Sequence, residues 1–225
     1  AATARMNLLA SADMDPTPEQ LSAMQEVVRK AMEEGALGVG SSLIYVPGTF
    51  AETDELVALA ATAARCGGIY ATHMRNEGRG LLDAIDETIE ISRRSGAPAE
   101  IYHLKAAGKD HWPTMDAAIA RIEAARREGL RITADMYAYP AGSTGLDAAM
   151  PPWVQEGGNA AWYARFRDSA VRRRVAEEMR ADNTDWENLM RAAGGAENVL
   201  VVVLRKPELK PMIGKTLAEI ARERG

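Results

Sequence analysis

The sequence is poor in cysteine and has no long hydrophobic run. Its 225 residues include a single cysteine, Cys66, which excludes an internal disulfide and fits a reducing compartment. No apolar run approaches the roughly 20 residues that cross a bilayer, so we expect no membrane segment and a cytoplasmic location. Residues 1–15 lack a basic stretch followed by an apolar core, so we expect no signal peptide there. Because the chain does not begin with methionine, a signal peptide further upstream stays open.

Two classes of ligand are disfavoured by what the sequence lacks. The net charge is −5, from 27 basic and 32 acidic residues, which argues against nucleic acid or an anionic membrane surface as a partner. No glycine-rich phosphate loop follows any strand-like segment. Gly214-Lys215-Thr216 has the ending of such a loop, but position 209, where its first glycine would stand, is Leu209. The oligomeric state is not indicated by the sequence.

Helical and strand-like segments alternate along the first 135 residues at a spacing of roughly 30, which is typical of βα units around a parallel sheet. Thr17 as N-cap, Pro18 as first helical residue and Gly35 as stop signal define the first helix. Later helices are expected at 53–65, 81–94 and 115–127, and strands within 36–48 and at 69–73, 100–104 and 130–135. A closed barrel and an open doubly wound sheet compete. We predict an α/β fold: a partial (β/α)8 TIM-type barrel of about four to five units.

The pattern changes after Asp135. Residues 136–158 form a long segment rich in glycine, proline and aromatic residues, which is typical of a functional loop. Helices are expected near 162–179, around 186–193 and after Gly214, with a strand at 199–204. We therefore divide the chain into βα units of the catalytic barrel at 1–158 and a helical insertion or lid at 159–225.

Two of the three histidines occupy equivalent positions, each at the carboxyl end of a predicted strand. A lone histidine there is more often a polar plug, but the pair His73 and His103, each followed two residues later by a cation, favours a metal site. The two cations, Arg75 and Lys105, suit an anionic group of a substrate such as a carboxylate, and a salt bridge is the alternative. Asp135 ends the fourth strand and has either a structural role or one in orienting a histidine or binding metal.

Four ordered segments resemble the N-acyl-D-amino-acid deacylases, or D-aminoacylases, of the amidohydrolase superfamily. They read GALGVGSSLIYVPGTFAETDELVALA, GGIYATHMRNEG, IYHLKAAGK and ITADMYAYPAGSTGLDAAMPPWVQEGG, and the likeness is dense over about residues 17–158. The resemblance implies a zinc-bearing barrel that cleaves the amide of N-acyl-D-amino acids into a carboxylate and a free D-amino acid. It also implies that His73 and His103 are catalytic residues that hold a tightly bound zinc ion.

The same resemblance implies the residues that bind substrate. Lys105 would contact the substrate carboxylate, with Arg75 beside it, and Tyr45 would line the pocket. Either Tyr137 or Tyr139 would help hold the scissile group. The loop from Gly142 to Leu146, which includes Ser143, would border the pocket.

Several parts of the family's site have no match in this sequence. An HxH pair and a zinc-binding cysteine would precede the first residue, and an aspartate serving as general base would follow the last. We therefore expect this chain to be a fragment of the catalytic domain and to be inactive alone. A hydantoinase-like or dihydroorotase-like enzyme acting on cyclic amides is the nearest alternative, but the strand LGVGSSL lacks the metal-bridging lysine of those enzymes. A non-catalytic barrel remnant is the other alternative.

Overall fold

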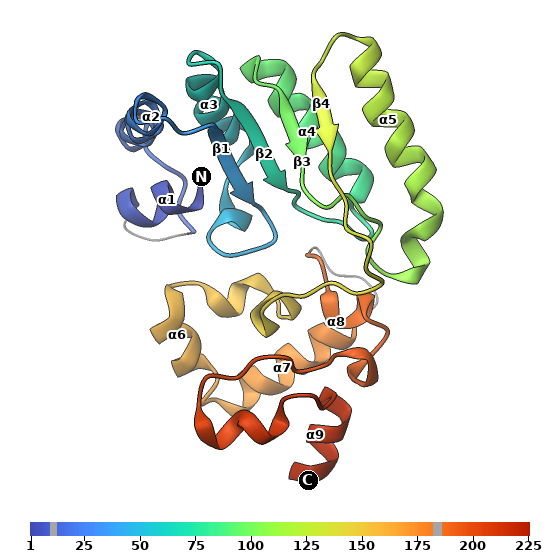
Figure 1. Ribbon diagram of the computed structural model, residues 1–225. Helices are drawn as coiled ribbons and strands as arrows, with labels where there is room; N and C mark the ends of the chain where they lie inside the picture. The colour runs from blue at the N-terminus through green and yellow to red at the C-terminus, as the bar shows by residue number, and fades with distance from the viewer. Residues whose placement is uncertain (10–12, 182–185) are drawn as a thin grey trace.

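The computed structural model describes residues 1–9, 13–181 and 186–225. One half of the molecule is a four-stranded sheet with its helices, and the other half is helical, as Figure 1 shows. The strands are all parallel and lie in the order β1-β2-β3-β4; they are β1 (Gly38–Ser42), β2 (Ile69–His73), β3 (Ala99–Ile101) and β4 (Ile132–Ala134). The helices of this half are α1 (Ala2–Leu8), α2 (Pro18–Glu33), α3 (Thr53–Ala64), α4 (Leu81–Ser95) and α5 (Met115–Arg127). The predicted α/β fold with a parallel sheet is confirmed.

Local signals set the helix ends where the sequence predicts them. The side chain of Thr17 accepts a hydrogen bond from the backbone N–H of Gln20, and the Gln20 side chain accepts one from the Thr17 N–H at 2.8 Å, which completes a capping box with Pro18 at the first position. Gly35 and Gly96 follow α2 and α4 at φ values of +102° and +72°, a conformation that glycine adopts at little cost.

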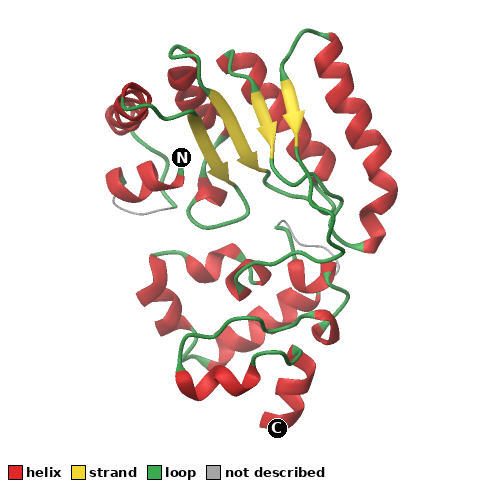
Figure 2. Cartoon of the chain, in the orientation of Figure 1, coloured by secondary structure: helices red, strands yellow, loops and turns green. Residues whose placement is uncertain are grey.

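Side chains on one face of the sheet pack against the helices and form the core. Val39, Tyr70, Ile101 and Ile132 come from β1 to β4 in turn, and all four are buried. Figure 2 shows the helices lying along one side of the strands. Because successive strand residues point to opposite faces, His73 points to the other face, away from this core.

The third strand is shorter than the predicted 100–104, because the chain turns at His103. β3 ends at Ile101, and His103 has a φ of +40°. The carboxylate of Asp135 accepts a hydrogen bond from the backbone N–H of His103, and the Leu104 N–H donates to the Asp135 carbonyl. These bonds replace continued strand pairing. β4 likewise covers only Ile132–Ala134 of the predicted 130–135.

The second half follows a long stretch without helix or strand after β4. Two short 3-10 turns, at Leu146–Ala149 and Pro152–Gln155, come first. The α-helices are α6 (Gly158–Arg165), α7 (Ser169–Arg180), α8 (Leu189–Ala192) and α9 (Leu217–Arg224). The single helix predicted near 162–179 is therefore wrong. Asp168 caps a new helix by accepting a hydrogen bond from the Ala170 N–H at 2.7 Å, so α6 and α7 are separate.

The strand predicted at 199–204 is also wrong. Its residues make one isolated antiparallel bridge, between Leu200 and Thr216, and Val201 bonds the turn at Gly214 and Lys215 through its backbone. The apolar run finds no neighbouring strand among the described residues, so propensity alone does not make it part of a sheet. In residues 1–9, 13–181 and 186–225, no helix has both the length and the apolar character that crossing a bilayer requires.

Candidate metal centre

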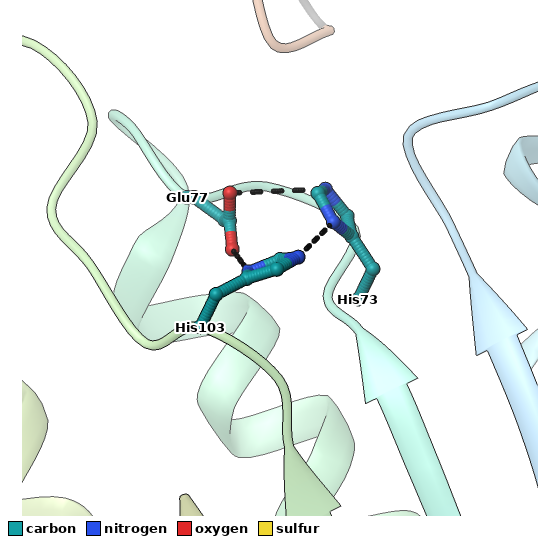
Figure 3. A group of neighbouring side chains, drawn as sticks. All are labelled: His73, Glu77 and His103. Atoms are coloured by element: carbon teal, nitrogen blue, oxygen red, sulfur yellow. Dashed lines mark hydrogen bonds and ion pairs between the residues drawn. The ribbon is translucent and has the colours of Figure 1, made fainter. Parts of the chain in front are cut away.

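His73, Glu77 and His103 form a compact cluster at the carboxyl end of the sheet, as Figure 3 shows. The Nδ1 atom of His73 lies 2.8 Å from the Nε2 atom of His103. Glu77 contacts the other side of both rings: its Oε1 lies 3.0 Å from His103 Nδ1, and its Oε2 lies 3.7 Å from His73 Nε2. One donor atom from each of the three residues lies within 4.8 Å of the others.

Neighbouring strands bring the two imidazoles together. His73 is the last residue of β2, and Thr72 beside it is in register with Ile101, the last residue of β3. His103 follows two residues later, and its φ of +40° is a conformation that non-glycine residues seldom adopt. Backbone strain of this kind gathers at functional sites, where the surrounding contacts hold it in place.

Glu77 is the acid of the cluster, and it is not among the site residues predicted from the sequence. Its side chain is only 2% exposed, and its Oε2 lies 2.5 Å from Lys105 Nζ. Its backbone is also held: the Glu77 N–H donates to Oε2 of Glu187 at 2.6 Å, and the Ala107 N–H donates to the Glu77 carbonyl at 2.7 Å. An acidic residue four positions after His73, within ATHMRNEG, is the signal that could have identified it.

Burial controls the protonation of the cluster. Burial, with the positive charges of His103 and Lys105 adding to it, lowers the pKa of His73 to about 3. Burial likewise lowers the pKa of His103 and raises that of Glu77, whereas Lys105 acts to lower the pKa of Glu77. His73 is therefore neutral at pH 7, which is the form that binds a metal ion.

The two cations that follow the histidines have different surroundings. Arg75 makes a bidentate ion pair with Glu87 at 2.8 and 2.9 Å, and it donates to the carbonyls of Thr49 and Ala51. This is the salt bridge that the sequence left as the alternative to substrate binding. Lys105 instead lies inside the cluster, 2.5 Å from Glu77 and 3.1 Å from the carbonyl of His103.

Aromatic residues flank the histidines on both sides. The ring of Tyr45 lies 5.4 Å from that of His73, and the ring of Tyr137 lies 6.4 Å from that of His103. Tyr139 is one step further away: its ring lies 6.5 Å from Tyr137, and its side chain is 77% exposed.

The loop that contains Ser143 is hydrogen-bonded to Tyr45. The hydroxyl groups of Tyr45 and Thr144 lie 2.7 Å apart, which brings the loop at 142–146 beside the residues after β1. Ser143 itself is exposed. Of the residues predicted to bind substrate, Tyr45, Tyr137 and Lys105 therefore lie beside the histidine pair. Tyr139 and the loop with Ser143 contact Tyr137 and Tyr45 instead, and Arg75 is engaged in its ion pair.

The donor set fits a divalent metal such as zinc, which takes imidazole nitrogen and carboxylate oxygen. Two nitrogens that share a tetrahedral zinc at about 2.0 Å each lie about 3.3 Å apart, so the 2.8 Å between the facing nitrogens needs only a small widening. Nε2 of His73, on the side of the ring that faces Glu77, is buried without a hydrogen-bond partner among the described residues.

Curated proteins similar to this chain share one kind of activity in their names. The chain is 36% identical over 129 residues to an N-acyl-D-glutamate deacylase, 35% over 137 to a D-aminoacylase and 30% over 146 to an N-acyl-D-aspartate deacylase, all from Alcaligenes xylosoxydans xylosoxydans. These matches cover 57%, 58% and 64% of this chain. The chain spans only 26% to 29% of the length of these relatives. No family model matches the chain.

Solved structures show the same likeness. A D-aminoacylase structure that defines a novel subset of amidohydrolases matches with a TM-score of 0.71 and 27% identity, over 100% of this chain and 38% of that one. An N-acyl-D-glutamate deacylase from Bordetella bronchiseptica, complexed with zinc and a phosphonate mimic of the tetrahedral intermediate, matches with a TM-score of 0.64 and 30% identity. That match covers 78% of this chain and 40% of the other.

Proposed function

The chain is related by sequence and by fold to the N-acyl-D-amino-acid deacylase family of the amidohydrolase superfamily, and on this premise we propose that it is part of a zinc-dependent amide hydrolase. The substrate is an N-acyl-D-amino acid, cleaved to a carboxylate and a free D-amino acid. The observation that carries this proposal is the cluster of His73, Glu77 and His103 at the carboxyl ends of adjacent parallel strands, where active sites of such folds are built.

His73 and His103 would hold the zinc ion through the two nitrogens that face each other. Glu77 would accept a hydrogen bond from His103 Nδ1–H and so keep the lone pair of Nε2 directed at the metal, as carboxylates beside metal-ligating histidines commonly do. When bound, zinc supplies a Lewis acid that polarises an amide carbonyl. Two of the three relatives are named for different D-amino acids, glutamate and aspartate, and the third name specifies none, so the side-chain preference is a separate question.

The residues around the histidines would orient the substrate. Lys105 lies within the cluster, where Glu77 holds it, and its ammonium group would donate a hydrogen bond to the substrate carboxylate. Tyr45 and Tyr137 would enclose the amide from either side, and the loop with Ser143 would border the acyl group. Holding the amide in one orientation removes much of the entropic cost of reaction. The general base and the remaining metal ligands implied by the resemblance have no match in this chain.

The sheet would form about half of a (β/α)8 barrel. Its strands lie side by side in the order of the sequence, whereas in a doubly wound sheet the order of the strands reverses at a switch point. The packed core against the helices lies on the face of Tyr70, and the opposite face, which carries His73, would face the barrel interior. We propose the division at 1–158 for the catalytic barrel and 159–225 for a helical insertion or lid, with the two 3-10 turns between Leu146 and Gln155 shortly before the boundary.

Hydrolysis of cyclic amides has less support. Hydantoinase-like and dihydroorotase-like enzymes normally use a metal-bridging lysine at the end of a strand, whereas β1 reads GVGSS and has no lysine. A non-catalytic scaffold would have no use for a buried acid held between two histidines and a lysine.

The test is the zinc content and deacylase activity of a His103→Ala variant of the full-length protein. Losing a residue that merely supports a metal ligand costs about 10- to 100-fold in metal affinity or activity. Loss of a ligand itself should therefore lower zinc content after dialysis and reduce hydrolysis of N-acetyl-D-amino acids by at least about a hundredfold. Substrates should include the N-acetyl derivatives of D-leucine, D-glutamate and D-aspartate, with their L-enantiomers as stereochemical controls.

His111→Ala is the matched control, because His111 lies outside the cluster on the 3-10 turn Lys109–Thr114. It should keep wild-type zinc and activity. A His103→Ala variant that retains both its zinc and its rate of hydrolysis would contradict the proposal. A wild-type protein that purifies without metal and cannot take up zinc would favour a non-catalytic scaffold.

A further inference from the structure

Glu187 is a buried acid from the helical half that reaches the loop after β2. It lies 110 positions from Glu77 in the sequence, yet its Oε2 accepts the Glu77 backbone N–H at 2.6 Å. Only 8% of the residue is exposed, and its other oxygen, Oε1, is buried without a hydrogen-bond partner among the described residues. An acid so placed costs desolvation free energy, which its bond to Glu77 offsets only in part.

The residues next to Glu187 hold it firmly in place. Asn188 is also 8% exposed; its side-chain oxygen accepts the Arg191 N–H at the start of α8, and its amide donates to the carbonyl of Met179 in α7 at 2.9 Å. Trp186 and Glu187 line both of two cavities, of about 510 and about 490 Å³. The Glu187 side chain therefore stands between two hollows, with its bond to the loop backbone joining the two halves of the molecule.

The loop that receives this bond carries the acid of the candidate metal centre. Both backbone polar groups of Glu77 form long-range hydrogen bonds: its N–H donates to Glu187, and its carbonyl accepts from the Ala107 N–H. The Glu77 carboxylate in turn contacts His103 and Lys105. A displacement of the Glu77 backbone would therefore move the group that orients a metal-ligating histidine.

We propose that Glu187 is a positioning residue that fixes the backbone of Glu77 and, through its carboxylate, the orientation of His103 and Lys105. This rests on the proposed metal site. In this role the helical half supplies the hydrogen-bond acceptor that holds the Glu77 backbone, and without it the residues of the metal centre would be less well ordered. Glu187 does not touch metal or substrate, and it acts through Glu77.

The experiment compares replacements that keep or remove the acceptor, in the full-length protein. Glu187→Gln keeps an oxygen able to accept the Glu77 N–H, whereas Glu187→Met keeps the length of the side chain and removes the acceptor. Glu187→Ala is a second variant without an acceptor, in case methionine prevents folding. Glu208→Ala, at an exposed acid of the same helical half, is the matched control.

Two readouts are needed. The first is amide hydrogen exchange of the peptide containing Glu77, measured on metal-free protein, and the second is the zinc dissociation constant from competition with a chelator. We expect the variants without an acceptor to exchange faster in this peptide and to bind zinc at least about tenfold more weakly, while exchange in α4 and β2 is unchanged. Glu187→Gln and Glu208→Ala should match the wild type in both.

Wild-type exchange and zinc affinity in the methionine and alanine variants would overturn the proposal, and so would equal losses in the glutamine and methionine variants. Exchange at Glu77 is measured without metal or substrate. It therefore tests the positioning role even if the His103→Ala result removes the hydrolase assignment.

Discussion

Replacing Glu77 with glutamine removes the charge that orders the candidate metal centre while keeping the shape of the side chain. The carboxylate lies 2.5 Å from Lys105 Nζ and 3.0 Å from His103 Nδ1, and it is 2% exposed. Glutamine retains one oxygen that can accept a hydrogen bond from His103. It loses the charged contact with Lys105, so this variant removes about one charge-assisted bond.

The loss of zinc-binding free energy has the same magnitude by two independent routes. A hydrogen bond to a charged group contributes about 1.5–3 kcal/mol. Removing the partner that orients a metal-ligating histidine weakens metal binding about 10- to 100-fold, which corresponds to about 1.4–2.7 kcal/mol at 25 °C. We therefore expect the zinc dissociation constant of Glu77→Gln to rise about 10- to 100-fold. Glu77→Ala should lie at the upper end, because His103 then loses its acceptor as well.

The assay is zinc competition against a chromophoric chelator, with circular dichroism and thermal unfolding as checks on folding. Glu123→Gln, an exposed acid on α5, is the control and should bind zinc like the wild type. Wild-type zinc affinity in a folded Glu77→Gln protein would contradict this expectation, since the contacts of this carboxylate would then have no effect on the histidines.

Two further predictions concern ion pairs away from the metal ligands. Arg5 and Glu55 form a buried pair with side chains 0% and 3% exposed, so Arg5→Met should lower the free energy of unfolding by about 3–5 kcal/mol. Adding Glu55→Leu should restore most of it, because burial raises the pKa of Glu55 despite its partner; urea titrations of the single and double variants that show simple additivity would contradict this. Arg75→Met should cost about 1.5–3 kcal/mol of stability through its bonds to Glu87 and two carbonyls. The KM of that variant should stay within a few-fold of wild type, and a tenfold rise without loss of stability would show instead that Arg75 binds substrate.

Most of the sheet and its helices could be predicted from local patterns. The capping box at Thr17 and the strand Ile69–His73 match the predicted elements, and α5 has the predicted bounds of 115–127. Such features depend on neighbouring residues alone: caps, stop signals and the spacing of apolar side chains. The cytoplasmic location and the absence of nucleic-acid binding stay predictions from composition.

Features that depend on partners distant in sequence were not predictable in the same way. The apolar run 199–204 has strand propensity but finds only the isolated bridge from Leu200. The turn at His103 depends on the carboxylate of Asp135, 32 residues away. Glu187 meets Glu77 across 110 residues. The spacing of apolar residues within one segment carries no information about these contacts, so they cannot be predicted from local sequence patterns.

Glu77 nevertheless follows from the rest of the site by a physical argument. Each of two adjacent strand ends places one imidazole beside one charge: His73 ends β2 and Glu77 follows in the next loop, and His103 and Lys105 both follow β3. A lysine beside two metal-ligating imidazoles would repel the cation unless an acid neutralised it. A buried carboxylate close to Lys105 removes this repulsion, and the parallel pairing of β2 with β3 brings the loop that follows His73 beside the end of β3. Glu77 is the acid of that loop, so the four residues act as one electrostatic unit rather than as two separate ligands.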